Sequence, residues 1–322
     1  MISIGINGFG RIGRCVTRHI MSQRNDMQIV QINATGGRET NMHLLKYDSV
    51  HGRYNGAIHE PILWTEERDI SQIKWANVDV VLECTGAYND GYKCIHHTIN
   101  GARKAIISAP ATNVKHTVVY GVNHKSLSKT DRVISNASCT TNCLAPLVKV
   151  LNDSLKIVAG QMTTIHSYTG DQATIDKKHK DPYRSRAGGV NIIPTSTGAA
   201  KALDLVLPEV SGKIKGSAIR VPTPNVSCVD LTVQVEKECS PETVNEFIKY
   251  ASQSSMKNII GFETDPLVSS DFNTTKESCI FVPDQTRVTN DHLVRVLAWY
   301  DNEWAFSCRM ADLASYIGKL TE

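Results

Sequence analysis

The chain has 322 residues, a formal net charge of +3 and 41% hydrophobic residues, so it is long enough for two domains with sizeable cores. This small positive charge argues against nucleic acid as an obligate partner, and no apolar run approaches membrane-spanning length. The first residues lack the features of a signal peptide, and the nine cysteines have no disulfide-framework spacing. We therefore expect a cytoplasmic protein with reduced thiols.

The chain begins with a pattern that is typical of dinucleotide binding. Residues 3–6 read as a short apolar strand, and helix-like residues run from 14 to about 21. Between them stand Gly8, Gly10 and Gly13 in the order Gly-x-Gly-x-x-Gly. The first glycine allows a tight turn, the second lets the backbone approach a pyrophosphate, and the third allows close packing of helix on strand.

A second strand is predicted at residues 28–33, and the residue after it bears on the choice of cofactor. An acidic side chain about twenty residues after the glycines normally accepts the ribose 2′-hydroxyl of NAD. Ala34 occupies this place, which removes repulsion towards a 2′-phosphate. Two interpretations of Arg38 remain open: it binds such a phosphate, or it is a solvated loop residue.

Further strands are predicted at residues 79–83, 105–110 and 117–123. Strands that alternate with helices over about 135 residues predict a mostly parallel, doubly wound sheet. The helix between the first two of these strands contains His96 and His97. Because adjacent helical residues do not point the same way, this pair indicates a solvated helix face rather than a metal site.

Residues 135–143 have the sequence Ser-Asn-Ala-Ser-Cys-Thr-Thr-Asn-Cys and lie between a predicted strand and a predicted helix. Cys139 therefore stands at a helix start, where free N–H groups and the helix dipole lower a thiol's pKa. Ser138 and Thr140 add donors for an anion. The alternatives are a buried, inert thiol, or half of a metal site with Cys143, although no second ligand pair completes one.

The second half of the chain is rich in predicted strands. Residues 161–169 form one of them and carry His166, which can pair with the thiolate of Cys139 or can be a structural histidine. The polar segment 170–193 is too long for an ordinary connection and suggests a functional loop. Thr197 and Gly198 then open a helix whose start suits an oxyanion, and Arg220 stands at a strand edge. Strands at 226–235, 277–282 and 292–299 predict a largely antiparallel sheet.

Four motifs together resemble phosphorylating glyceraldehyde-3-phosphate dehydrogenases, and the resemblance extends over nearly the whole chain. They are Gly-Phe-Gly-Arg-Ile-Gly-Arg at residues 8–14, the cysteine motif at 135–143, His-Ser-Tyr-Thr-x-Asp-Gln at 166–172 and Trp-Tyr-Asp-Asn-Glu-Trp at 299–304. Two departures stand out. Lys177 and Lys178 replace a usual Leu-Pro pair, and Ala305-Phe306 replaces Gly-Tyr, which removes a hydroxyl near the nicotinamide.

The resemblance implies an α/β Rossmann dinucleotide-binding domain plus an α+β catalytic domain with a largely antiparallel sheet. The first is expected at residues 1–137, with a C-terminal helix at about 303–322 packed back on it, and the second at 138–302. The implied reaction converts glyceraldehyde 3-phosphate, phosphate and NAD(P)⁺ to 1,3-bisphosphoglycerate and NAD(P)H through a thioacyl intermediate on Cys139, with His166 as the base. A homotetramer is expected, with no metal and with NADP favoured over NAD.

The resemblance also assigns residues to three sites. The substrate phosphate is expected at Thr169, Arg184 and Arg220. The attacking phosphate is expected at Ser138, Thr140, Thr197 and Gly198. The cofactor residues are Gly8, Gly10, Arg11, Ile12, Gly13, Ala34, Arg68, Thr85, Ser108 and Asn302.

Three other functions remain as alternatives. Erythrose-4-phosphate dehydrogenases share the cysteine motif but typically lack the Tyr-Thr and Thr-Gly pairs that this chain has at 168–169 and 197–198. A Cys–His hydrolase needs no dinucleotide, so the glycine motif speaks against it. A nucleic-acid or surface-binding role is at most a side activity, because the charge is modest and the chain lacks an aromatic-basic stripe.

Overall fold

The computed structural model describes residues 1–58 and 61–320. It divides into two compact units. The first comprises residues 1–138 and the C-terminal stretch that begins at Phe306, and the second comprises residues 139–305. Among the described residues, none of the helices is long and apolar enough to cross a lipid bilayer.

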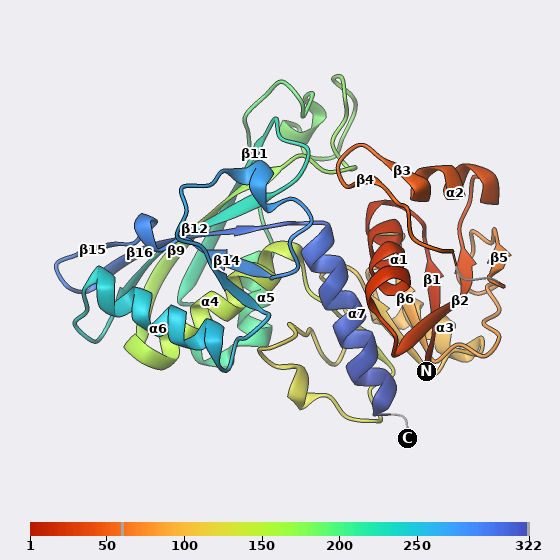
Figure 1. The fold of residues 1–322 in the computed structure, drawn as a ribbon, viewed down its shortest axis with the longest axis horizontal. Helices are drawn as coiled ribbons and strands as arrows, with labels where there is room; N and C mark the ends of the chain where they lie inside the picture. The colour runs from red at the N-terminus through yellow and green to blue at the C-terminus, as the bar shows by residue number, and fades with distance from the viewer. Residues whose placement is uncertain (59–60, 321–322) are drawn as a thin grey trace. The chain divides into compact units, whose positions relative to one another are not determined.

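In its described part, the first unit is built on a six-stranded sheet in which neighbouring strands are parallel (Figure 1). The strand order is β5-β2-β1-β6-β7-β8, so the order reverses between β1 and β6. Strands β6 and β7 are buried along their whole length, as expected of a parallel sheet covered on both faces. The strands are β1 (Ile2–Asn7), β2 (Met27–Asn33), β5 (Leu63–Thr65), β6 (Val80–Glu83), β7 (Lys104–Ile107) and β8 (Val133–Ser135).

Short connections and helices complete this unit. The strands β3 (Tyr47–Asp48) and β4 (Gly52–Arg53) form a small antiparallel pair, and η1 (His124–Ser126) is a single 3-10 turn. The helices are α1 (Arg11–Gln23), α2 (Arg38–Lys46), α3 (Gly91–Ile99) and most of α7 (Trp304–Lys319), which belongs to this unit from Phe306 onward.

The predicted strand at residues 117–123 is wrong. Only Thr117 forms a bridge, with Ser135. The side chain of Asn123 accepts from the backbone N–H of Val119 at 2.8 Å and donates to the carbonyl oxygen of Thr117 at 3.0 Å. Gly121 has a φ of +90°, which turns the chain. The asparagine side chain thus satisfies backbone groups that a neighbouring strand would otherwise bind.

The second unit contains a mixed, largely antiparallel sheet of eight strands, all of which lie in described residues. The order is β10-β11-β9-β12-β16-β14-β13, with β15 paired to β16, and only β11–β9 and β13–β14 are parallel. The strands are β9 (Ile157–Ser167), β10 (Ile193–Thr195), β11 (Ile214–Val221), β12 (Ser227–Val235), β13 (Ile260–Phe262), β14 (Cys279–Phe281), β15 (Arg287–Thr289) and β16 (Leu293–Tyr300).

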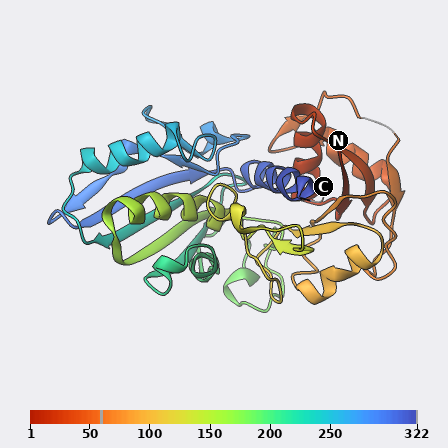
Figure 2. The ribbon, with the colours of Figure 1, turned by 90° about the horizontal axis from the view of Figure 1, so that it is seen from below.

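Three helices lie on one face of this sheet: α4 (Cys139–Leu155), α5 (Ala199–Val206) and α6 (Pro241–Gln253), as Figures 1 and 2 show. The long helix α4 contacts β9, β12, β14 and β16. In β16 every second residue is buried, and these residues end with Tyr300, which is 1% exposed. This packing fixes the first turn of α4 against the ends of β9 and β16.

The expected loop between residues 170 and 193 has little regular structure. It contains one 3-10 turn, η2 (Tyr183–Ser185), and ends where β10 begins at Ile193. Its polar side chains pair largely with one another, as in the contact of Arg186 with Asp176 at 2.8 Å.

Candidate active site

Cys139 is the first residue of α4 and follows β8 after a sharp turn. Ala137 makes this turn with a φ of +56°, a left-handed conformation that is costly for a residue with a side chain. The first turn of a helix has backbone N–H groups without helical partners, and the helix dipole is positive there. The predicted position of the cysteine at a strand-to-helix junction is confirmed.

His166 lies near the end of β9, with its Nε2 3.5 Å from Sγ of Cys139. The imidazole is buried, and its Nδ1 is 2.7 Å from the carbonyl oxygen of Ser167. Because a carbonyl oxygen can only accept a hydrogen bond, we assign the imidazole proton to Nδ1. Nε2 then keeps a lone pair for the thiol proton, so this pair can generate a thiolate during reaction.

Arg220 is the third member of this arrangement. It stands opposite His166 in the parallel pairing of β11 with β9. Its Nη1 donates to the carbonyl oxygen of Ser167 at 2.8 Å and to Oγ1 of Thr169 at 3.1 Å. The same nitrogen is 3.0 Å from Nδ1 of His166, so the positive charge lies against the imidazole.

The electrostatics differ from the sequence-based expectation. Burial raises the pKa of the Cys139 thiol, and Arg220 and the groups of Thr140 offset only part of this effect. Burial and, after it, the charge of Arg220 lower the pKa of His166 to about 3. Both shifts favour a neutral thiol beside a neutral imidazole in the ligand-free chain. The expected lowering of the thiol pKa is therefore wrong, because the helix start does not outweigh desolvation of the sulfur.

A cluster of arginine and aspartate side chains adjoins this pair. Nη1 of Arg184 is 2.8 Å from Oδ2 of Asp171, and the Thr169 hydroxyl donates to the other oxygen of that carboxylate. Arg220 faces the same carboxylate, and Nε of Arg184 is also 3.8 Å from Oδ2 of Asp181, so two guanidinium groups lie among two carboxylates. Nε of Arg220 is buried and has no hydrogen-bond partner among the described residues. A buried guanidinium group with an unused donor is suited to binding an anion.

The residues expected at the site of the attacking phosphate lie at or just before the starts of α4 and α5. Gly198 is the N-cap residue of α5, and Oγ1 of Thr197 accepts from the backbone N–H of Ala199 at 3.2 Å. The hydroxyl of Thr140 is 2.8 Å from that of Tyr300, so it is already engaged inside the unit. Ser138 immediately precedes α4.

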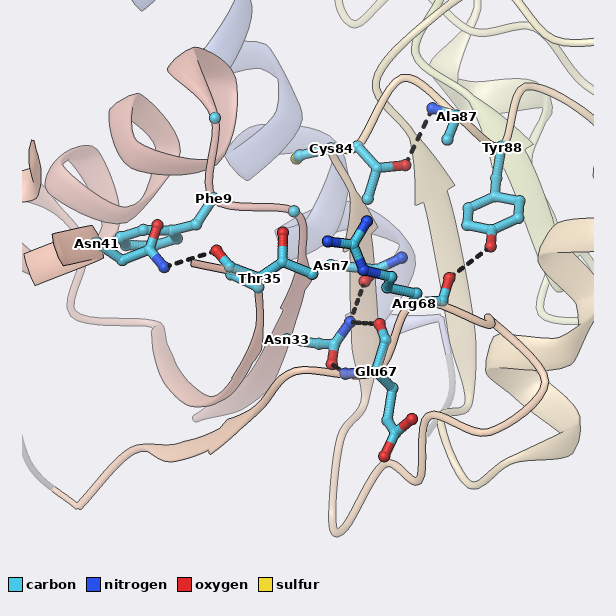
Figure 3. Close-up of a pocket in the computed structure, with 14 residues that line it drawn as sticks. Asn7, Phe9, Asn33, Thr35, Asn41, Glu67, Arg68, Cys84, Ala87 and Tyr88 are labelled. Carbon is cyan, nitrogen blue, oxygen red and sulfur yellow. Dashed lines mark hydrogen bonds between the residues drawn. The ribbon is translucent and has the colours of Figure 1, made fainter. Parts of the chain in front are cut away.

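A pocket of about 440 Å³ lies in the first unit, at the carboxyl ends of β1, β2 and β6 (Figure 3). This is the edge of a parallel sheet where dinucleotides bind. Of the expected cofactor residues, those that line the pocket are Gly8, Gly10, Ala34, Arg68 and Thr85.

The glycines of the turn fit a dinucleotide. Gly8 has a φ of +91°, and a Cβ there would lie 2.7 Å from the backbone nitrogen of Thr85. A Cβ on Gly13 would lie 2.1 Å from the carbonyl oxygen of Gly8, so only glycine permits this close packing. A Cβ on Gly10 would meet no atom within 4 Å, which leaves its backbone open to a ligand. These are the three roles that the sequence predicts.

The remaining expected cofactor residues do not line this pocket. Ile12 and Arg11 lie in the first turn of α1, where Nη1 of the arginine is 2.5 Å from Oδ2 of Asp48. Ser108 follows β7. Asn302 belongs to the second unit, where its Oδ1 accepts hydrogen bonds from the hydroxyls of the serines at 167 and 227, each at 2.9 Å.

Family models match most of the chain. The model of the glyceraldehyde 3-phosphate dehydrogenase NAD-binding domain matches residues 2–91, and that of its C-terminal domain matches residues 138–302. The chain belongs to the glyceraldehyde 3-phosphate dehydrogenase family. This membership confirms the predicted fold class and an NAD(P)-dependent aldehyde dehydrogenase of the phosphorylating type.

Several curated relatives of this family match over their whole length. The chain is 51% identical to a glyceraldehyde-3-phosphate dehydrogenase of Cereibacter sphaeroides and 51% identical to one of Xanthobacter flavus, with 99% of each chain covered. It is 47% identical to one of Geobacillus stearothermophilus, with 98% of each chain covered.

Sequence reasoning missed part of the lining of the pocket in the first unit. Asn7, Asn33, Glu67 and Tyr88 line it, and the first two end neighbouring parallel strands. Polar residues at the carboxyl ends of adjacent strands were the available signal. Sequence reasoning also missed Tyr300, whose ring packs edge-on against His166 with centroids 5.9 Å apart.

Proposed function

We propose that this chain oxidises glyceraldehyde 3-phosphate with inorganic phosphate to 1,3-bisphosphoglycerate through a thioester on Cys139. The observation that carries the proposal is the 3.5 Å approach of His166 Nε2 to the Cys139 sulfur, with Arg220 beside the imidazole. A nucleophile, a base and an anion-binding cation therefore lie on neighbouring elements of one unit.

The residues act in a defined order in this proposal. His166 Nε2 takes the thiol proton while the Cys139 sulfur attacks the aldehyde carbon, and the imidazolium returns that proton to the new alkoxide. Nε2 then accepts the hydroxyl proton of the hemithioacetal as the carbon is oxidised to a thioester. When bound, the nicotinamide dinucleotide supplies the acceptor for the hydride that leaves this carbon. Phosphate finally attacks the thioester carbon, and the cysteine sulfur is the leaving group.

Two anion sites support this sequence. The cluster of Thr169, Arg184 and Arg220 holds the phosphate of the substrate, because it offers two guanidinium groups, a hydroxyl and an unused buried donor. The attacking phosphate is held by Ser138, Thr140, Thr197 and Gly198, since the starts of α4 and α5 offer backbone N–H groups.

The pocket at the end of β1, β2 and β6 would hold the dinucleotide, with Gly8 and Gly10 at the pyrophosphate and Arg68 and Thr85 on its walls. We propose that NADP is preferred. Position 34 holds alanine, so no carboxylate stands there. The Arg38 guanidinium lies over the ring of Trp64, 5.9 Å from its centroid, and Arg38 begins α2 two residues after Gly36 of the turn that follows β2. We propose that Arg38, which begins α2 four residues after Ala34, binds the 2′-phosphate.

The assembly is also part of the proposal. Members of this family are generally tetramers, and in them the loop that corresponds to residues 170–193 comes close to a neighbour's adenosine. Lys177 and Lys178 in that loop would add positive charge beside the same phosphate. A homotetramer therefore fits both the family and the preference for NADP.

Steady-state kinetics test the function. Initial rates are measured with NAD and with NADP, on glyceraldehyde 3-phosphate and on erythrose 4-phosphate, with and without inorganic phosphate. We expect the higher kcat/KM with glyceraldehyde 3-phosphate and a strict need for phosphate in turnover. A higher kcat/KM with erythrose 4-phosphate would replace the substrate proposal, and ester hydrolysis without any dinucleotide would replace the reaction class.

A further inference from the structure

A row of buried hydrogen bonds runs behind the dinucleotide pocket of the first unit. Nε1 of Trp75 is 3.1 Å from Nδ1 of His97, and Nε2 of the same histidine is 3.0 Å from Oε2 of Glu83. All three side chains are buried, with the histidine 0% and the glutamate 1% exposed. The predicted solvated face at His97 is therefore wrong, because α3 packs this side of the helix against β7 and the ring against the indole.

The direction of each hydrogen bond in this row is fixed. An indole N–H can only donate, so Nδ1 of His97 must accept. A neutral imidazole then carries its proton on Nε2 and donates it to Glu83. Trp75 thus sets the tautomer of the histidine, and the histidine supplies one donor to the carboxylate.

Glu83 receives three further donors. The side-chain nitrogen of Asn7 is 2.5 Å from Oε2, the oxygen that also accepts from His97. The backbone N–H of Thr85 is 2.8 Å from Oε1, and the hydroxyl of Thr85 donates to the same oxygen. Each carboxylate oxygen therefore has two donors, which is full coordination for an ionised group that accepts only. Asn7 and Thr85 both line the pocket.

The row continues to the opposite side of the pocket (Figure 3). Because the nitrogen of the Asn7 amide faces Glu83, its oxygen accepts from Nδ2 of Asn33 at 2.8 Å. The oxygen of the Asn33 amide then accepts from the backbone N–H of Glu67 at 2.9 Å, and its nitrogen donates to the carbonyl oxygen of that residue at 2.8 Å. The carboxylate of Glu83 can only accept, so it fixes which way the Asn7 amide faces. The Asn7 amide in turn fixes which way the Asn33 amide faces.

We propose that Glu83 is a positioning residue for the dinucleotide. Its charge orients Asn7 and, through it, Asn33, and it holds the backbone at Thr85 against the glycine turn. Together these contacts fix the ends of β1, β2 and β6 and the segment at Arg68 in the geometry that binds the cofactor. The inference rests on the proposed dinucleotide function of this pocket.

The alternative is that the row only stabilises the fold. A structural role predicts that a variant that still folds binds the cofactor normally. A positioning role predicts weaker binding in a folded protein, with little change in the chemistry of the second unit. Affinity measured on folded protein therefore separates the two roles.

The first experiment is calorimetric titration of Glu83→Gln with NAD and with NADP, well below the unfolding temperature. The new amide places a donor against Asn7 or Thr85, so we expect the dissociation constant to rise about tenfold or more. We expect kcat at saturating cofactor, and the rate of Cys139 alkylation without cofactor, to stay within about twofold.

Asp131→Asn is the matched control. Asp131 is also a buried carboxylate of the first unit, and it accepts from Lys115 and from Ser128 at 2.7–2.9 Å, but it does not line the pocket. We expect this variant to lose unfolding stability and to keep its cofactor affinity within about twofold. Equal weakening in Glu83→Gln and Asp131→Asn, or normal binding by folded Glu83→Gln, overturns the inference.

A second pair of variants decides the matter if Glu83→Gln does not fold. His97→Gln keeps one donor and one acceptor, whereas His97→Leu keeps the volume and has neither. A positioning role predicts a rise of at least fivefold in the dissociation constant for the leucine variant, with rescue by glutamine; equal affinity of the two overturns it. Failure of the wild-type chain to bind either dinucleotide would instead refute the proposed function on which the inference rests.

Discussion

The phenolic oxygen of Tyr300 lies 2.8 Å from Oγ1 of Thr140, in the first turn of α4, and 2.9 Å from Oγ1 of Thr164 on β9. All three residues are buried, and burial raises the pKa of the phenol well above its ordinary value. The hydroxyl is therefore a permanent donor and acceptor that joins the helix carrying the nucleophile to the strand carrying the base.

Tyr300→Phe keeps the ring beside His166 but leaves the two threonine hydroxyls without this partner. We expect the free energy of unfolding to fall by about 1–3 kcal/mol, the cost of leaving buried hydroxyls unsatisfied. We also expect the KM for phosphate to rise severalfold with little change in the KM for the aldehyde, because the hydroxyl of Thr140 loses its orientation. Denaturant unfolding and steady-state kinetics measure both effects. Tyr250→Phe removes an exposed hydroxyl of the same unit and serves as the control; equal effects in both variants would contradict the account.

His166→Asn tests the assignment of the base. The variant loses the lone pair at Nε2, so we expect the acylation rate at neutral pH to fall by roughly 10²–10⁴-fold, the usual contribution of a general base. The alkylation of Cys139 by iodoacetamide should slow as well. His292→Asn changes a histidine of the same unit away from this pair and should leave both rates unchanged. Normal acylation in a destabilised His166→Asn variant would identify the histidine as structural.

Arg220→Gln tests the electrostatic arrangement. Burial and the guanidinium hold the pKa of His166 at about 3, so the imidazole is neutral throughout the physiological range. Removing the cation removes a repulsion of the imidazolium, and the pKa of His166 should therefore rise while staying below its ordinary value because burial remains. Arg220→Lys keeps the charge and should shift the pKa less. NMR titration of labelled histidine reports both, and no upward shift in the glutamine variant would contradict the argument.

Features whose physical cause lies within a short stretch of the chain were predicted from the sequence. The glycine turn is one such case, since Gly8 needs a positive φ and Gly13 cannot carry a Cβ against the neighbouring carbonyl. The start of α4 at Cys139 is another, because a β-branched run followed by helical spacing marks the junction.

Features that depend on distant partners were not predictable from local patterns. His97 is buried because Trp75, 22 residues earlier, packs edge-on against it and donates a hydrogen bond to it. The segment 117–123 has the composition of a strand, but the side chain of Asn123 takes the place of a neighbouring strand. The raised pKa of Cys139 follows from desolvation, which depends on how the whole unit packs around the sulfur.

Ala34→Asp tests the cofactor preference. A carboxylate at this position would repel a 2′-phosphate and accept from a ribose diol, so we expect kcat/KM for NADP to fall by at least about tenfold and that for NAD to rise. Gln72→Glu adds the same charge at an exposed position outside the pocket and should change neither value. A wild-type preference for NAD, together with no loss of NADP efficiency in Ala34→Asp, would overturn the charge argument.

The most direct test of the central claim is a burst experiment without phosphate. The chain is mixed rapidly with glyceraldehyde 3-phosphate and oxidised cofactor, and reduced cofactor is followed by absorbance while the protein is analysed by mass spectrometry. We predict a burst of about one equivalent per chain, a phosphoglyceroyl adduct on the peptide that contains Cys139, and release of the adduct when phosphate is added. Absence of a burst, an adduct on a different residue, or a normal burst in Cys139→Ser would contradict a thioester on Cys139.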